Sequence, residues 1–185
     1  TFGLAYRKES DRIDAAVEAY PNRWTHHVMI GTEEEIDEEL ISWIQEAAEF
    51  AERTKGKICQ WFTTDTLTYL KRGGRVSATT AIVGNMLDIR PVLHVAEDGS
   101  LGSVKKVRGR KASVQALCDR LVQTAHKDTP VFISHADCKA DAKKLTELIR
   151  EKTGLQTTLI TNVGPVIGAH AGPGTLALFF LGSER

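Results

Sequence analysis

The chain has 185 residues, enough for one domain with a buried core or for two small lobes. Its 24 basic and 24 acidic residues cancel, so no bulk field points to nucleic-acid or membrane-surface binding. No apolar run reaches the roughly 18 residues of a membrane span, and the first residues lack the pattern of a signal peptide. The three cysteines form no CxxC pair, so we expect no metal site, no disulfide framework and a reducing, cytoplasmic location.

The first third of the chain is expected to hold two helices around a short strand. Apolar residues recur at helical spacing over 10–20, and the apolar run 27–30 indicates a strand. Thr32 followed by Glu35 has the pattern of a capping box, which predicts a long helix that ends at Gly56. Its expected inner face carries Ile36, Leu40, Trp43, Ile44, Ala47, Phe50 and Ala51.

The middle of the chain is expected to hold a short helix between two turns. A strand over 58–63 leads to Thr64 and Asp65, which we expect to cap a helix over 66–72. Two glycines end that helix, and a second helix over 78–87 is almost entirely apolar or small. A helix that is apolar all round is buried, so this one is either a core helix or one wall of an elongated apolar cavity.

The second half alternates strands with helices, which predicts an α/β protein built from layers of sheet and helix. Strands over 89–95 and 101–107 are expected to form a hairpin about Asp98-Gly99, with Pro91 at an edge or an early strand position. The remaining elements are expected as helix 110–126, strand 130–134, helix 138–152, strand 156–161, Gly/Pro-rich loop 162–174 and strand 175–181.

The turn Arg72-Gly-Gly-Arg75 is the first candidate site. Its glycines permit a close approach of the backbone to a ligand, and a guanidinium beside them can form a bidentate contact with a carboxylate or phosphate. Lys71 and Arg72 also fit a helix C-terminus, where cations complement the helix dipole. Arg75 comes after the glycines and fits that explanation less well, so it is the candidate for contact with an anion.

A single histidine, His170, lies in the Gly-rich string 164–174. A lone histidine is usually structural, but loops carry function, and this one is a candidate hydrogen-bond donor to an anion. The string is not a P-loop, because no Gly-Lys-Ser/Thr follows. The sequence leaves the structural and the functional interpretation of His170 equally open.

The remaining polar motifs give little evidence for an enzyme. Residues 105–111 hold five cations without interleaved aromatic residues, which indicates a docking patch or a solvated strand end rather than general nucleic-acid binding. Ser134, His135, Asp137 and Cys138 are too close in sequence to form a triad readily, and we interpret His135 as structural. No HExxH, GxSxG or CxxC motif occurs, and the other histidines have no partners at metal-ligand spacing.

Four motifs combine into one pattern, and their order and spacing resemble the DegV family of bacterial fatty-acid-binding proteins. They are Asp65-Thr-Leu-Thr-Tyr-Leu-Lys-Arg-Gly-Gly-Arg-Val-Ser, Ile89-Arg-Pro-Val-Leu, Lys106-Val-Arg-Gly-Arg-Lys and Gly164-Pro-Val-Ile-Gly-Ala-His-Ala-Gly-Pro-Gly. The resemblance covers about residues 32–182. We therefore expect an unmatched N-terminal segment over 1–31 and a DegV-like domain over 32–185.

The resemblance implies a two-lobed α/β protein that binds a long-chain fatty acid in an apolar tunnel. Such a carrier is not an enzyme and needs no cofactor. It presents the bound acid to a fatty-acid kinase, which makes an acyl phosphate for phospholipid synthesis. By motif position, the resemblance assigns Arg75 and His170 to the carboxylate, Ala78, Ile82 and Met86 to the tunnel wall, and Arg108 and Arg110 to kinase docking.

One departure from the family bears on function. Family members are about half as long again, and the Asp-Ser strand motif and Thr/Ser-rich loop of their first lobe are not found in this sequence. We expect a fragment, or a short member whose first lobe is missing or divergent. The open apolar surface that results would favour a homodimer. Two alternatives stay open: an interaction fragment that binds no ligand, and an enzyme acting on a small anionic substrate.

Overall fold

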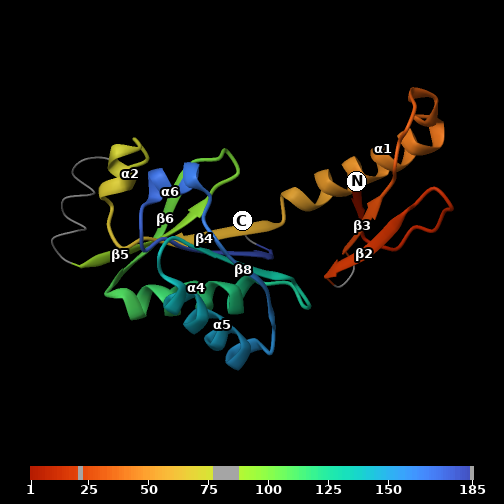
Figure 1. The fold of residues 1–185 in the computed structure, drawn as a ribbon. Helices are drawn as coiled ribbons and strands as arrows, with labels where there is room; N and C mark the ends of the chain where they lie inside the picture. The colour runs from red at the N-terminus through yellow and green to blue at the C-terminus, as the bar shows by residue number, and fades with distance from the viewer. Residues whose placement is uncertain (21–22, 77–87, 184–185) are drawn as a thin grey trace. The chain divides into compact units, whose positions relative to one another are not determined.

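The computed structural model describes residues 1–20, 23–76 and 88–183, which form two compact units, Thr1–Gly56 and Lys57–Arg185 (Figure 1). The predicted helix over 78–87 lies outside the described residues. The predicted division between residues 31 and 32 marks where the family resemblance begins and does not refer to compact units. It stays a prediction.

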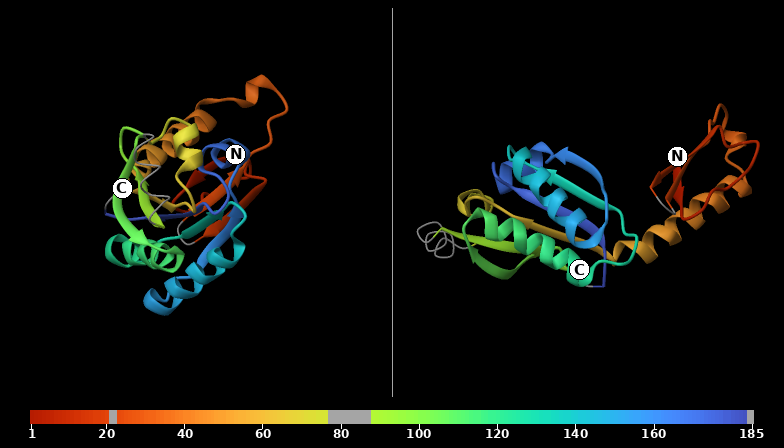
Figure 2. Two further views of the ribbon diagram at one scale, coloured as in Figure 1. Left: turned by 90° about the vertical axis from the view of Figure 1, so that its left-hand side faces the viewer. Right: turned by 90° about the horizontal axis from the view of Figure 1, so that it is seen from below.

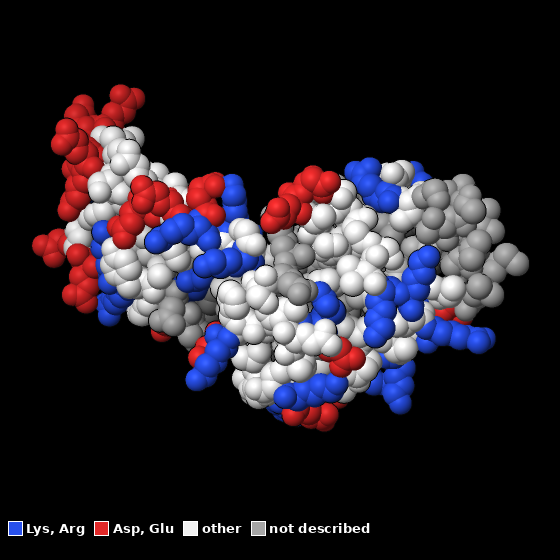
Figure 3. Space-filling model, turned by 180° about the vertical axis from the view of Figure 1, so that it is seen from behind, with Lys and Arg blue, Asp and Glu red and all other residues white. Residues whose placement is uncertain are grey.

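Unit 1 is a small antiparallel sheet with one long helix. Strands β1 (Phe2–Leu4), β3 (Arg23–His27) and β2 (Ala15–Tyr20) lie in that order, and a 3-10 turn, η1 (Glu33–Glu35), precedes helix α1 (Glu38–Lys55). The core lies between β1 and α1 and contains Phe2, Leu4, Leu40 and Trp43. Acidic side chains are prominent on unit 1 in Figure 3, and both η1 and the first turn of α1 are acidic.

Two elements predicted for unit 1 are wrong. The predicted helix over 10–20 does not form, and its second half, 15–20, is strand β2. The strand predicted over 27–30 lies earlier, as β3, and ends at His27. The pairing of β2 with β3, in which Ala16 lies opposite His26, supplies the backbone hydrogen bonds that a helix would otherwise have to make internally. Met29 and Ile30 lie beyond this pairing and are exposed.

The long helix was correctly expected, but its start was not. Thr32 precedes only the short η1 turn and makes no capping side-chain bond, whereas Asp37 caps α1 by accepting a 3.0 Å hydrogen bond from the Leu40 N–H. The Glu35 side chain accepts a bond from the Gly31 N–H, one residue before the predicted partner. The predicted end at Gly56 is confirmed.

Unit 2 is a six-stranded mixed sheet with the strand order β6-β5-β4-β9-β7-β8. Among the described strands of this sheet, β7 and β8 are the one neighbouring pair that runs parallel. The strands are β4 (Ile58–Thr63), β5 (Ile89–Val95), β6 (Leu101–Arg108), β7 (Val131–His135), β8 (Thr157–Asn162) and β9 (Leu176–Leu181). The predicted β5–β6 hairpin is confirmed, and Pro91 pairs only with Lys106 of β6 because the pairing of β4 with β5 stops at Val92.

The two faces of this sheet are covered differently. Helices α4 (Arg110–Thr124) and α5 (Lys139–Thr153) pack along one face, and the short helices α2 (Thr68–Arg72) and α6 (Pro165–Ala171) lie on the other (Figures 1 and 2). The main core fills the α4–α5 side and includes Trp61, Leu117, Leu121, Ile133, Leu145 and Leu178. On the α2–α6 side, the described residues form a smaller core with Leu67, Leu70, Leu93 and Ala171.

The Gly/Pro-rich segment 162–174, predicted as a loop, contains helix α6. Gly164 stands at its N-cap, Pro165 fills the first helical turn, and Gly172 ends it with φ +81°. A proline with no N–H to satisfy is favourable at that first position, and a glycine at positive φ is a common helix stop. The composition of the segment therefore marks the two ends of a short helix.

The core of unit 1 contains a buried histidine, His26. His26 is fully buried, its ring stacks on Phe2 with centroids 5.1 Å apart, and its Nε2 accepts a hydrogen bond from the Lys8 N–H. Burial lowers the pKa of His26 below its ordinary 6.5.

We expect the free energy of unfolding of unit 1 to fall as the pH drops below 6.5. At pH values between the pKa of His26 in the folded chain and its pKa in the unfolded chain, the unfolded chain binds one more proton than the folded chain. The stabilisation is therefore complete above the unfolded pKa and is lost as the pH falls toward the folded pKa. Urea unfolding followed by circular dichroism at pH 7.5 and 5 measures the change in free energy of unfolding. His26→Gln should make that change smaller. The exposed neighbour His27, changed to Gln, is the control, and an equal effect from both substitutions would contradict the assignment.

Candidate binding pocket

The α2–α6 side of the unit 2 sheet contains a pocket of about 940 Å³. This volume is near the upper end of the range for small-molecule sites, roughly 300–1,000 Å³. Its lining is mainly apolar and includes Phe62, Leu70, Leu101, Ile167, Ala177 and Phe179. The described residues that line the pocket all belong to unit 2.

The floor of the pocket follows from the two-residue period of the strands. In β4, Cys59 and Trp61 are buried in the α4–α5 core, so Gln60 and Phe62 are directed to the opposite face. The register places Phe62 opposite Ala177 of β9, and Ala177 opposite Ser134 of β7. One row of side chains across three strands therefore forms the floor.

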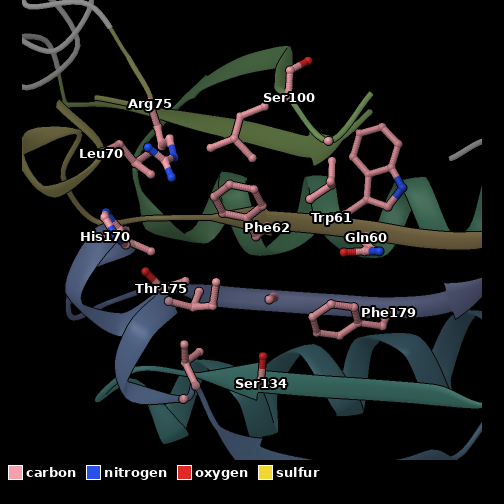
Figure 4. A pocket seen from close by; sticks show the side chains of 18 of the residues that line it. Gln60, Trp61, Phe62, Leu70, Arg75, Ser100, Ser134, His170, Thr175 and Phe179 are labelled. Atoms are coloured by element: carbon pink, nitrogen blue, oxygen red, sulfur yellow. The ribbon is translucent and has the colours of Figure 1, made fainter. Parts of the chain in front are cut away.

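Arg75 and His170, the two predicted anion contacts, both line this pocket. Figure 4 shows them at one end of it, with Gln60 and Phe179 toward the other end. Arg75 follows the end of α2 and donates a 2.7 Å hydrogen bond from Nη1 to the Gly73 carbonyl. His170 stands in the last turn of α6 and is partly buried.

Three glycines explain how two distant segments meet so closely. A Cβ at Gly73 would overlap the His170 ring, a Cβ at Gly172 the Tyr69 ring, and a Cβ at Gly174 the Asp65 carboxylate. Gly172 and Gly174 also have φ values of +81° and +79°, which other residues adopt only with strain. The glycines of both motifs are therefore the contact surface between α2 and α6.

Asp65 does not cap α2, contrary to the prediction. The helix begins after Leu67, and the Thr68 N–H donates instead to Thr66 Oγ1 at 3.2 Å. The Asp65 carboxylate forms ion pairs with Arg90 at 3.1 Å and with Arg110 at 3.3 Å. The local sequence suggested a cap because Thr-Asp precedes a helix, whereas the cationic partners come from β5 and α4.

The other cations of the two basic motifs have different environments. Lys71 and Arg72 stand in the last turn of α2, as expected, and the Arg72 guanidinium lies 5.7 Å from the Tyr69 ring centroid. Arg108 is exposed at the end of β6. Arg110 is largely buried and pairs with Asp141 at 2.9 Å as well as with Asp65. The predicted tunnel residues Ala78, Ile82 and Met86 lie outside the described residues.

The string Ser134-His135-Ala-Asp-Cys138 does not form one constellation. Ser134 lines the pocket, whereas His135, the next residue of β7, is buried on the opposite face of the sheet. The Cys138 thiol donates to the Thr175 carbonyl at 3.2 Å, and burial raises its pKa. Within the described ranges, no three His, Cys, Asp or Glu side chains gather as a possible metal site, and none of the helices there is long and apolar enough to cross a membrane.

Comparison with known proteins places this fold and its motifs in a family. Residues 41–183 match the profile of the uncharacterised DegV family. The chain belongs to the DegV family. Residues 3–51, which fall in unit 1 of this DegV-family chain, also match a domain of unknown function, DUF5655.

The similarity to DegV relatives covers most of this chain but only part of theirs. A DegV domain-containing protein of Clostridium perfringens is 43% identical over 150 residues, which is 80% of this chain and 49% of that protein. A Streptococcus pyogenes relative is 33% identical over 139 residues, or 75% of this chain and 48% of its own length. The chain thus spans about half the length of the curated relatives it matches.

Solved structures with a similar fold include two that are at least 25% identical to this chain. A fatty acid binding DegV family protein from Streptococcus agalactiae is 30% identical, with a TM-score of 0.64 over 82% of this chain and 52% of that one. The Streptococcus pneumoniae Fatty Acid Kinase (Fak) B3 protein loaded with linoleic acid is 26% identical, with a TM-score of 0.69 over 80% and 53%. The predicted α/β, DegV-like fold class is confirmed.

Sequence reasoning did not identify several polar residues of this DegV-family pocket. Gln60, Ser134 and Thr175 all line it, and the Thr175 hydroxyl donates to the Gly172 carbonyl at 2.7 Å. Strand alternation was the available signal for Gln60 and Ser134, because both fall between core-facing neighbours. Thr175 carried no such signal, since its place depends on how α6 returns to β9.

We expect Gly172→Ala to destabilise unit 2 by about 2–4 kcal/mol, because it combines a positive φ with overlap against the Tyr69 ring. Urea unfolding of the chain measures the loss. Gly168→Ala is the matched control, since a Cβ there meets no neighbour and the residue lies within α6. Equal stability of the two variants would contradict the close α2–α6 contact.

Proposed function

We propose that this chain binds a long-chain fatty acid in the unit 2 pocket, with the carboxylate at Arg75 and His170. The observation that carries the proposal is the convergence of these two side chains at one end of an apolar pocket of about 940 Å³. An amphiphile with one anionic end and an apolar chain matches that distribution of polarity. The acyl chain would lie along the sheet floor past Phe62 and Ala177.

The energetics require both parts of this site. Burying an acyl chain contributes about 0.8 kcal/mol per CH₂. Burying its carboxylate without partners would cost several kcal/mol. A guanidinium has five N–H donors, and the contact of Arg75 with Gly73 uses one of them, so others stay available for a carboxylate.

The comparisons support the ligand class. The Streptococcus agalactiae relative is described as fatty acid binding, and the Streptococcus pneumoniae structure is loaded with linoleic acid. We further propose that the helix predicted over 78–87, which directly follows the Arg75 turn, contributes Ala78, Ile82 and Met86 to the tunnel wall. Because the chain spans about half of its relatives, a partner surface or a further lobe would complete that tunnel.

We also propose that the chain is a carrier rather than an enzyme, and that it presents its ligand to a fatty-acid kinase. The name of the Streptococcus pneumoniae neighbour supports a kinase partner. For docking, the structure favours Arg108 over Arg110, because Arg108 is exposed beside Lys105 and Lys106 while Arg110 is held in internal ion pairs. Lys and Arg are also prominent on the face of unit 2 that Figure 3 shows. A homodimer and a cytoplasmic location stay predictions.

We expect Arg75→Ala and His170→Ala each to weaken oleate binding about tenfold or more, since a hydrogen bond to a charged group is worth roughly 1.5–3 kcal/mol. Isothermal titration calorimetry and native mass spectrometry measure the binding. Arg72→Ala, which removes a neighbouring exposed cation, is the control. Unchanged affinity in both site variants would refute the assignment, and a wild-type chain that takes up no oleate would favour the interaction-fragment alternative.

We expect Arg108→Glu to weaken binding to a fatty-acid kinase and to leave oleate binding unchanged, because Arg108 does not line the pocket. Surface plasmon resonance with immobilised kinase measures the first quantity and calorimetry the second. Lys144→Glu on the exposed side of α5 is the charge-matched control. If both variants bound the kinase equally well, docking through the end of β6 would be excluded.

A further inference from the structure

Asp65 touches both segments that carry the proposed carboxylate contacts. It directly precedes the turn into α2, after which the chain reaches Arg75. Its carboxylate also fills the space where Gly174 has no side chain, just beyond the helix that carries His170. Its own side chain is not part of the pocket lining. Asp65 is therefore next to both halves of the site without belonging to either.

Two arginines hold this carboxylate in place. Arg90 of β5 forms an ion pair with the Asp65 carboxylate at 3.1 Å and also donates a hydrogen bond to the Asp65 carbonyl. Arg90 therefore contacts both the side chain and the backbone of Asp65. Arg110 of α4 approaches the same oxygen at 3.3 Å. The side chains of Arg90 and Arg110 are only 19% and 18% exposed, whereas that of Asp65 is 48% exposed.

The ion pairs connect the pocket side of the sheet with its helix layer. Arg110 begins α4 and also pairs with Asp141 in the first turn of α5 at 2.9 Å. Backbone bonds add to this connection, because the Gly174 N–H donates to the Ala136 carbonyl at 2.7 Å. The segments that bear Arg75 and His170 are thus attached through Asp65 to the most deeply packed part of unit 2.

The ion pairs of Asp65 reduce the repulsion that its negative charge would exert on an anionic ligand. A lone carboxylate near a bound fatty acid would repel its head group. Arg90 and Arg110 offset the negative charge of Asp65, and each of them also pairs with a second carboxylate, Asp88 at 2.9 Å and Asp141 at 2.9 Å. The pairing therefore lets an acidic residue serve as an anchor beside an anion site.

We propose that Asp65 is a positioning residue that orients α2 and α6 so that Arg75 and His170 can both bind the carboxylate of one fatty acid. This inference rests on the proposed function for its ligand, but the placement of His170 can be observed without any ligand. The variant is Asp65→Asn, which keeps the shape of the side chain and removes its charge. The matched control is Asp119→Asn, which breaks a different ion pair of unit 2, with Lys152 at 2.8 Å.

The experiment compares three measurements on the full chain: the ring NMR resonances of His170 without ligand, the oleate affinity and the thermal midpoint. We expect Asp65→Asn to move the His170 resonances and to weaken oleate binding by roughly tenfold, the scale of one charged contact. Asp119→Asn should change neither the His170 resonances nor the oleate affinity, even if it lowers the thermal midpoint as much as Asp65→Asn does.

The outcomes separate this inference from the proposed function. Unchanged His170 resonances and unchanged oleate affinity in Asp65→Asn would overturn the positioning role, as would equal changes in Asp119→Asn. If the wild-type chain bound no oleate but Asp65→Asn still moved the His170 resonances selectively, the ligand assignment would fail while the positioning role stood.

Discussion

The candidate site depends on the close contact of α2 with α6. Gly73, Gly172 and Gly174 leave room for the His170 ring, the Tyr69 ring and the Asp65 carboxylate, respectively. A side chain at any of these glycines would push the two segments apart, and with them Arg75 and His170. Packing therefore determines the arrangement before electrostatics does, because the polar side chains can lie close together only where the glycines let the two backbones approach.

The sheet of unit 2 provides the second condition for a binding site. One of its faces is filled by α4 and α5, which fixes the positions of the strands and leaves their alternate residues on the other face. On that face, among the described residues, Phe62, Ala177 and Phe179 line the pocket beside the two short helices. An apolar floor of this kind suits a ligand with an elongated apolar part.

The ion pairs of Asp65 change the interpretation of the basic motif after β6. Arg108 and Arg110 are only two residues apart, yet one is exposed and the other pairs with Asp65 and Asp141. Gly109, with φ +81°, turns the chain between strand and helix and separates their environments. Neighbouring cations of a single motif can thus have unrelated roles, and only the direction of each side chain distinguishes them.

The sequence by itself determined the strong periodic elements, since α4, α5 and the β5–β6 hairpin arise from local patterns and turn residues. It also pointed to Arg75 and His170, because glycine-rich turns are recognisable without a partner. Only the tertiary structure decided that 15–20 is a strand, that α6 is a helix and that Asp65 binds two arginines. The reason is physical: these features depend on pairing with β3, on packing against α2 and on charges from β5 and α4, which local sequence does not contain.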